Sequence, residues 1–195
     1  MLSSREIVST LEMLQSEHLD LRTVTLGINL MDCVSDDADK LCRNIRTKIK
    51  TLARHLVATC NNISDKYGIP VVNKRISVSP IAIVAAPFDS RQMVRVANTL
   101  NEVAAEVNVD FIGGFSALVE KGLANGDRSL IEAIPEALGR TDRVCASVNV
   151  ASTRAGINMD AVLMMGEVIK AAAEKTAEND GIAAAKLCVF ANIPQ

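Results

Sequence analysis

Residues 109–119, Val-Asp-Phe-Ile-Gly-Gly-Phe-Ser-Ala-Leu-Val, form an apolar run that is interrupted by two adjacent glycines. A continuous apolar run bounded by turn signals predicts a strand that is buried on both faces of a sheet. Paired glycines in a strand either form a bulge that relieves packing or leave bare backbone for a ligand to approach. Both interpretations of Gly113 and Gly114 stay open from the sequence.

Strands and helices alternate on either side of this run. Apolar and polar residues alternate over 21–31, 71–79 and 143–150, which predicts three strands, and an apolar run predicts a last strand over 186–192. The run 81–86 fits either a short buried helix or a continued strand. Alternation of this kind favours parallel strands, so we expect a single α/β domain over residues 1–195 with five parallel strands between helices.

Helix signals fill the intervals between the predicted strands. Ser3 and Glu6 predict a capping box for a helix that ends near His18, and Asp89 and Gln92 predict another box for a helix that ends near Val107. The other predicted helices are one long helix from the acidic cluster 35–37 to Gly68, a short helix over 128–138 that Pro135 breaks or restarts, and a helix capped by Asn158.

Three of the five predicted strands carry one apolar face and one face of small polar residues. The polar rows are Thr23, Thr25, Gly27 and Asn29; Asn73, Arg75, Ser77 and Ser79; and Cys145, Ser147 and Asn149. A doubly wound sheet is covered by helices on both faces and is apolar on both. The rows therefore favour a half-barrel with helices on one face and a wet cavity on the other. The alternative is that the polar faces meet solvent or satisfy one another.

Composition excludes several kinds of partner. Net charge is -2 without a basic face, and aromatic residues make up 3% with no tryptophan, so we expect no nucleic-acid partner. No apolar run approaches the ~18 residues of a membrane span, and the N-terminus lacks a signal-peptide layout, which predicts no membrane partner and a cytoplasmic location. The five cysteines lack a C-x-x-C pair, so we expect reduced and mostly buried thiols.

The candidate chemistry is anion binding. His18 and His55 have no ligand at zinc spacing, and the paired glycines lack a Walker lysine, so we expect no metal and can name no cofactor. An inward Arg75 must pair with a carboxylate such as Asp32 or Asp110, or must meet a ligand. The loop 152–158 precedes a helix N-terminus, which is a natural anion site. The predicted ligand-binding residues, which we expect to converge on one cavity, are Asn73, Arg75, Gly113, Gly114, Ser147, Asn149, Thr153 and Asn158.

Several segments together resemble a known family. Residues 20–28, 68–78, 109–118, 147–149 and 156–159 are similar to the N-terminal half of the uncharacterised protein family 0210, which is also called domain of unknown function 711. The resemblance implies a place in the pyruvate-formate-lyase-like group, whose fold is a ten-stranded β/α barrel made of two antiparallel halves. It also implies homodimers and no assigned activity. This chain lacks a glycyl-radical motif and adjacent cysteines, so we expect no radical chemistry.

Members of that family are more than twice as long as this chain. The resemblance therefore implies a truncated or split form with two unpaired sheet edges, which should be marginally stable. Such a chain should self-associate as a homodimer or need a separately encoded second half. Two functions stay open: an enzyme acting on a small polar or anionic metabolite in a barrel cavity, and a non-catalytic assembly or structural module, or an inactive gene fragment.

Overall fold

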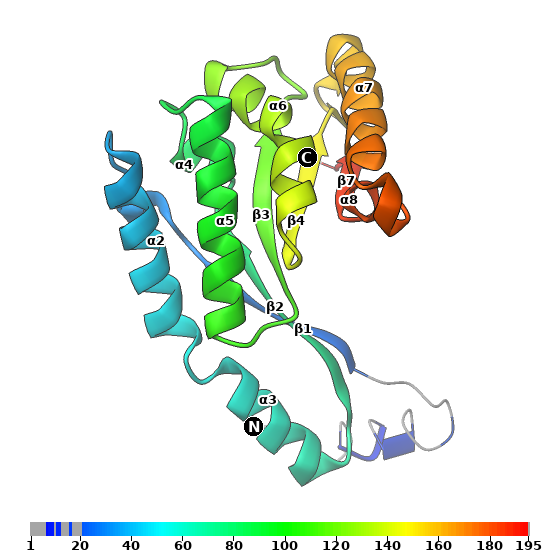
Figure 1. The fold of residues 1–195 in the computed structure, drawn as a ribbon. Coiled ribbons are helices and arrows are strands. Elements are labelled where there is room, and N and C mark those ends of the chain that lie inside the picture. The colour runs from blue at the N-terminus through cyan, green and yellow to red at the C-terminus, as the bar shows by residue number, and fades with distance from the viewer. Residues whose placement is uncertain (1–6, 10, 13–15, 17–20, 195) are drawn as a thin grey trace.

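The computed structural model describes residues 7–9, 11–12, 16 and 21–194. Its main sheet has five parallel strands in the order β1-β2-β3-β4-β7 (Figure 1), which confirms the predicted α/β fold with five parallel strands. The strands are β1 (Leu21–Ile28), β2 (Val71–Val78), β3 (Phe111–Leu118), β4 (Val144–Asn149) and β7 (Leu187–Phe190). A small antiparallel pair, β5 (Ala151–Ser152) and β6 (Gly156–Ile157), follows β4.

The long helices form a single layer. In Figure 1, α2, α5 and α6 stand in front of the sheet and α7 lies beside α6. The described helices therefore leave the opposite face of the sheet open. The helices are α2 (Ala38–Ala53), α3 (Leu56–Tyr67), α4 (Ile81–Val84), α5 (Ser90–Glu106), α6 (Asn125–Arg140), α7 (Met159–Lys175) and α8 (Ile182–Ala185), with short 3-10 turns η1 (Met31–Cys33) and η2 (Ala177–Asn179).

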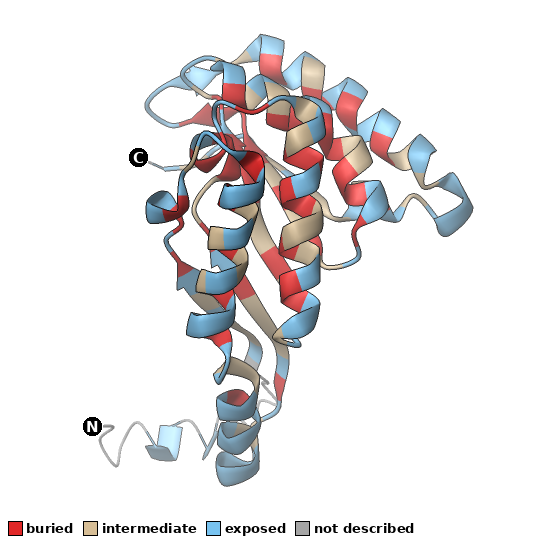
Figure 2. Cartoon of the chain, turned by 60° about the vertical axis from the view of Figure 1, so that its left-hand side comes forward, coloured by how far each residue is buried: buried red, intermediate tan, exposed pale blue. Residues whose placement is uncertain are grey.

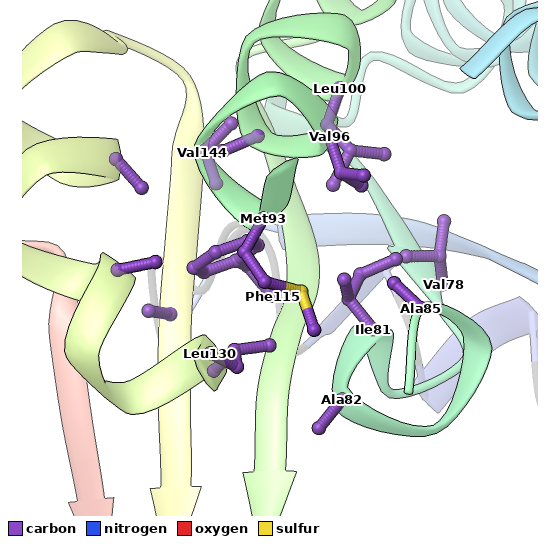
Figure 3. Packing of buried hydrophobic residues seen from close by; sticks show 14 of the residues in the cluster. Val78, Ile81, Ala82, Ala85, Met93, Val96, Leu100, Phe115, Leu130 and Val144 are labelled. Atoms are coloured by element: carbon purple, nitrogen blue, oxygen red, sulfur yellow. The ribbon is translucent and has the colours of Figure 1, made fainter. Parts of the chain in front are cut away.

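The core lies between the sheet and this helix layer. Figure 2 shows buried residues along the helix faces that turn toward the sheet. Phe115 of β3 is fully buried and lies beside Met93 of α5 and Leu130 of α6 (Figure 3). Full burial of one such apolar side chain contributes about 1.5–3 kcal/mol, so this layer supplies the main stabilisation of the fold.

The strand prediction for residues 109–119 needs one correction. β3 is the middle strand of the five, and it is fully buried on the helix side, but on the other side only Ser116 is buried. Leu118 on the other side is 49% exposed, because no described helix covers that side. The two-sided burial that a continuous apolar run favours in parallel sheets is therefore incomplete here.

Two helix predictions were wrong in detail. The helix predicted from residues 35–37 to Gly68 is two helices, α2 and α3, which meet at Arg54 and His55. A straight helix over this range would be roughly 45 Å long, whereas an eight-residue strand is roughly 26 Å long. The end of such a helix would extend beyond the sheet and could not pack on it. Pro135 neither breaks nor restarts a helix, since α6 runs continuously through it. Ile134 and Ala137 on either side of it are fully buried, so core packing holds this part of α6 in place.

Other local predictions are confirmed. Asp89 and Gln92 form a reciprocal capping box at α5, and Asn158 caps α7 by accepting from the Ala161 N–H. The run 81–86, for which the sequence left a helix and a strand open, contains the helix α4. Residues 7–9 and 11–12 are helical, whereas the predicted Ser3–Glu6 box lies outside the described residues.

The α5 capping box gives a first test. Asp89→Ala removes the Oδ1 that accepts from Gln92 N at 2.8 Å and should lower the free energy of unfolding by about 1 kcal/mol. Asp36→Ala, an exposed aspartate beside the N-cap of α2 rather than at it, is the control and should change stability by less than about 0.5 kcal/mol. Urea unfolding measures both. Equal stability of Asp89→Ala and wild type would contradict a stabilising role for the box.

Candidate functional site

The uncovered side of the main sheet, called the open face below, carries the polar rows. Strand register places its side chains in four rows, each of which runs across neighbouring strands. The rows follow one another from the N-terminal ends of the strands to their C-terminal ends. These rows are Thr25, Arg75 and Phe111; Gly27, Ser77 and Gly113; Ser116, Ser147 and Cys188; and Leu118, Asn149 and Phe190. Most of these side chains are half-buried or exposed, whereas Ser116 and Asn149 are buried. The open face is thus a polar wall with a few apolar side chains.

The predicted site residues do not all lie on this face. Arg75, Gly113, Ser147 and Asn149 do, since they alternate with the buried core residues of their strands, and Asn73 lies on the same side of β2 two residues before Arg75. The other three lie elsewhere. Gly114 sits in a β-bulge and turns toward Val78, Thr153 lies in the turn between β5 and β6, and Asn158 lies at the start of α7.

Arg75 and Asn149 share the open face but lie far apart. Arg75 pairs with Phe111 and Asn149 with Leu118, seven residues further along β3. The bulge takes up one of these residues, so six steps of ~3.3 Å along the strands and two spacings of ~4.8 Å across them separate the two Cα atoms by roughly 20 Å. The open face therefore has a lower group around Arg75 and an upper group around Asn149, rather than one cluster of all the predicted residues.

The lower group surrounds a cavity of about 380 Å³. The Arg75 guanidinium stacks on Phe111 at 5.3 Å from the ring centroid, and its Nε is buried without a hydrogen-bond partner. The residues that line the cavity are Arg75, Phe111, Asp142, Cys145, Ile182, Ala185 and Lys186. The Arg75 Nε–H is thus a buried hydrogen-bond donor without an acceptor, and Arg75 lines a cavity that is large enough for a small molecule.

Neither carboxylate that was considered as a structural partner pairs with Arg75. Asp110 Oδ2 accepts from the Lys74 backbone N–H at 2.7 Å, and Asp32 pairs with Lys48. Among residues 21–194, Arg75 makes no ion pair. The ion-pair interpretation of Arg75 therefore finds no support within the described chain.

Lys186 is a cavity residue that the sequence indicated only as the first residue of the last predicted strand. Its Nζ donates to the Leu138 carbonyl at 2.8 Å and to the Thr141 carbonyl, which satisfies the end of α6. Burial lowers the pKa of its ammonium group, and the Asp142 carboxylate opposes that shift. Burial also raises the pKa of the Cys145 thiol, although Arg75 and Lys186 act to lower it. Cys145 is thus a protonated neighbour of Arg75 near neutral pH.

The upper group lies at the C-terminal ends of β3 and β4. Asn149 is only 4% exposed and its Nδ2 donates to Glu120 Oε2 at 3.1 Å, while its Oδ1 is buried without a partner. Leu118 and Phe190, on either side of Asn149 in the same row, are 49% and 43% exposed. Asn149 is therefore a buried amide between two apolar side chains.

The remaining candidates make structural contacts. Asn158 uses both side-chain atoms, since Nδ2 donates to the Val119 carbonyl at 2.7 Å and Oδ1 accepts from Ala161 N at 3.1 Å. The N-terminus of α7 is thus already capped by the protein. Thr153 is exposed, and its N–H donates to the Ile193 carbonyl at 3.0 Å.

All five cysteines are free thiols, but the expectation that most are buried is wrong. Only Cys33 and Cys60 are buried, while Cys188 is exposed because it lies on the open face of β7. Within the described residues, no three His, Cys, Asp or Glu side chains are grouped to hold a metal ion, and no helix is long and apolar enough to cross a membrane.

Fold and face together define a class of protein: a parallel α/β unit with helices on one side of its sheet and a polar open face on the other. Comparison with known proteins then identifies the family, because the profile of Uncharacterised ACR (DUF711) matches residues 12–195. The chain belongs to this family, which confirms the resemblance seen in the sequence.

Curated relatives extend well beyond this chain. A UPF0210 protein of Desulfovibrio desulfuricans is 65% identical over 195 residues, which is 100% of this chain and 42% of the relative. UPF0210 proteins of Syntrophobacter fumaroxidans (65% over 195 residues, 43% of the relative) and Methanosarcina acetivorans (57% over 193 residues, 99% of this chain, 42% of the relative) are also similar. The chain thus spans less than half the length of these relatives and corresponds to their N-terminal half.

Proposed function

We propose that this chain forms one half of a β/α barrel of the pyruvate-formate-lyase-like type, and that its open face lines a cavity for a small anionic metabolite. Three observations support the proposal. The described helices cover one face of the sheet, the other face is polar, and relatives have enough additional length for a second half. A cytoplasmic location and assembly, either as a homodimer or with a separately encoded second half, belong to the same proposal.

Arg75 carries the ligand part of this proposal. A buried guanidinium N–H without a partner is unfavourable, and a bound carboxylate or phosphate would remove that penalty. The planar guanidinium donates two parallel hydrogen bonds to such anions, and stacking on Phe111 fixes its orientation. The cavity beside it, at about 380 Å³, lies within the size range of small-molecule sites.

A non-catalytic assembly module is the second candidate. The free side of α7 favours it, since Met159 and Leu163 there are 66% and 71% exposed. Contiguous exposed apolar side chains mark surfaces that bind protein. A pure assembly module has no reason to bind an anion through Arg75, so anion binding separates the two functions.

The test is titration of inorganic phosphate into wild type, Arg75→Met and Arg75→Lys by isothermal calorimetry. Loss of a charged hydrogen bond is worth about 1.5–3 kcal/mol, so Arg75→Met should weaken phosphate binding by roughly ten- to hundredfold. Arg75→Lys should bind with intermediate affinity, because lysine keeps the charge without the planar fork.

Arg91→Met provides the matched control, since Arg91 is an exposed arginine on α5 in the helix layer. It should bind phosphate as wild type does. Circular dichroism verifies that each variant is folded. Unchanged phosphate affinity in Arg75→Met, or an equal loss in Arg91→Met, would contradict a specific anion site at Arg75.

A further inference from the structure

The upper group of the open face has a different chemistry from the cavity at Arg75. Glu120 fixes the orientation of the Asn149 amide, because only Nδ2 can donate to the carboxylate, at 3.1 Å. Oδ1 is therefore the atom that remains, and it is a buried acceptor without a partner. A buried polar atom of this kind is rare in folded proteins and calls for a specific explanation.

Register shows what surrounds this acceptor. Asn149 belongs to the open-face row of β4, so its side chain leaves the sheet on the side that no described helix covers. Leu118 of β3 and Phe190 of β7 stand directly opposite it on the two neighbouring strands, and both are partly exposed. A buried polar atom is thus flanked by two partly exposed apolar side chains, a combination of groups that small-molecule sites use.

The structure assigns this row as a subsite for a primary ammonium group carried by a small ligand with an apolar chain. One ammonium N–H would donate to Asn149 Oδ1, and the adjacent Glu120 carboxylate would favour the positive charge. The apolar chain would lie between Leu118 and Phe190. An anion is disfavoured here, because the remaining polar atom of the Asn149 side chain accepts hydrogen bonds and its Nδ2 already donates to the Glu120 carboxylate.

This subsite does not depend on the proposed anion site. It uses neither Arg75 nor the cavity around it, and it lies roughly 20 Å away along the open face. It also lies at the C-terminal ends of parallel strands, where ligand sites of β/α proteins usually gather.

The experiment compares three probes of similar size and different charge on ¹⁵N-labelled wild-type protein at constant ionic strength. Propylammonium should shift the Asn149 side-chain amide and the Leu118 and Phe190 backbone amides saturably, with a Kd on the order of 1 mM, which is about 1 kcal/mol per non-hydrogen atom and below the ceiling of about 1.5 for small ligands. Propionate and 1-propanol should shift these signals at least about tenfold more weakly at equal concentration.

Two variants locate the binding. Asn149→Leu keeps a similar volume but removes the acceptor, so saturable propylammonium binding should be lost, whereas Asn62→Leu on the exposed surface of α3 should bind as wild type does. Leu118→Lys replaces a half-exposed side chain and should fill the subsite with its own ammonium group, which should also abolish binding. Leu118→Met should retain it.

The wild-type probe series decides the proposal even if Asn149→Leu fails to fold. Equal shifts with propionate, absence of saturable shifts with propylammonium, or unchanged binding in Leu118→Lys would each overturn the subsite. None of these outcomes alters the phosphate titration at Arg75, so failure here and failure of the proposed anion site are distinguishable.

Discussion

Gly114→Ala should lower the free energy of unfolding by about 4 kcal/mol, a large part of the ~5–15 kcal/mol total of a typical domain. Gly114 has φ +110, a backbone conformation that costs other residues about 1–3 kcal/mol. An alanine Cβ would also lie 2.5 Å from the Val78 carbonyl oxygen. That oxygen belongs to the neighbouring strand, so relief of the clash would distort the β2–β3 ladder.

Gly113→Ala is the matched control for this substitution. A Cβ on Gly113 would meet no atom within 4 Å, because it would project from the open face, and its φ is not positive. The free energy of unfolding should stay within about 1 kcal/mol of wild type. Urea unfolding of both variants measures the difference. Similar destabilisation by the two alanines would show that the bulge does not press Gly114 against Val78.

The second large effect is expected at the start of α6. Gly126→Ala should lower the free energy of unfolding by about 3 kcal/mol, because a Cβ there would lie 2.5 Å from the Ala82 carbonyl oxygen and 2.8 Å from the Ala86 Cα. Both atoms belong to the backbone of the segment around α4, which packs closely on α6. The higher helix propensity of alanine, worth about 1 kcal/mol, offsets only part of this cost.

Gly166→Ala in α7 should raise the free energy of unfolding, whereas Gly126→Ala should lower it. Gly166 is an exposed helical glycine with nothing within 4 Å of an added Cβ, so propensity alone acts and stability should rise by about 1 kcal/mol. Thermal and urea unfolding of the two variants give the comparison. A stabilised Gly126→Ala, or a destabilised Gly166→Ala, would show that close packing is not what separates the two glycines.

The sequence alone predicts the order of helices and strands, and it predicts that one face of the sheet is apolar and the other polar. The box of Asp89 and Gln92 and the cap at Asn158 use side chains within three residues of the N–H groups they satisfy, so their partners lie within the sequence pattern. The polar rows depend on period-two alternation, which any extended strand obeys. Among the described residues, the long helices lie on one side of the sheet, as these rows predicted.

Contacts between distant segments set the remaining features. The division of α2 from α3 depends on the length of the strands beneath them, and Pro135 is tolerated because the surrounding core holds α6. The bulge at Gly113 and Gly114 shifts register between β3 and β4, which places Asn149 beside Leu118 rather than beside Ala117. Burial of Asn149 Oδ1 and Arg75 Nε without partners arises only when strands pack together, because a strand's own pattern gives the face of a side chain but not its neighbours.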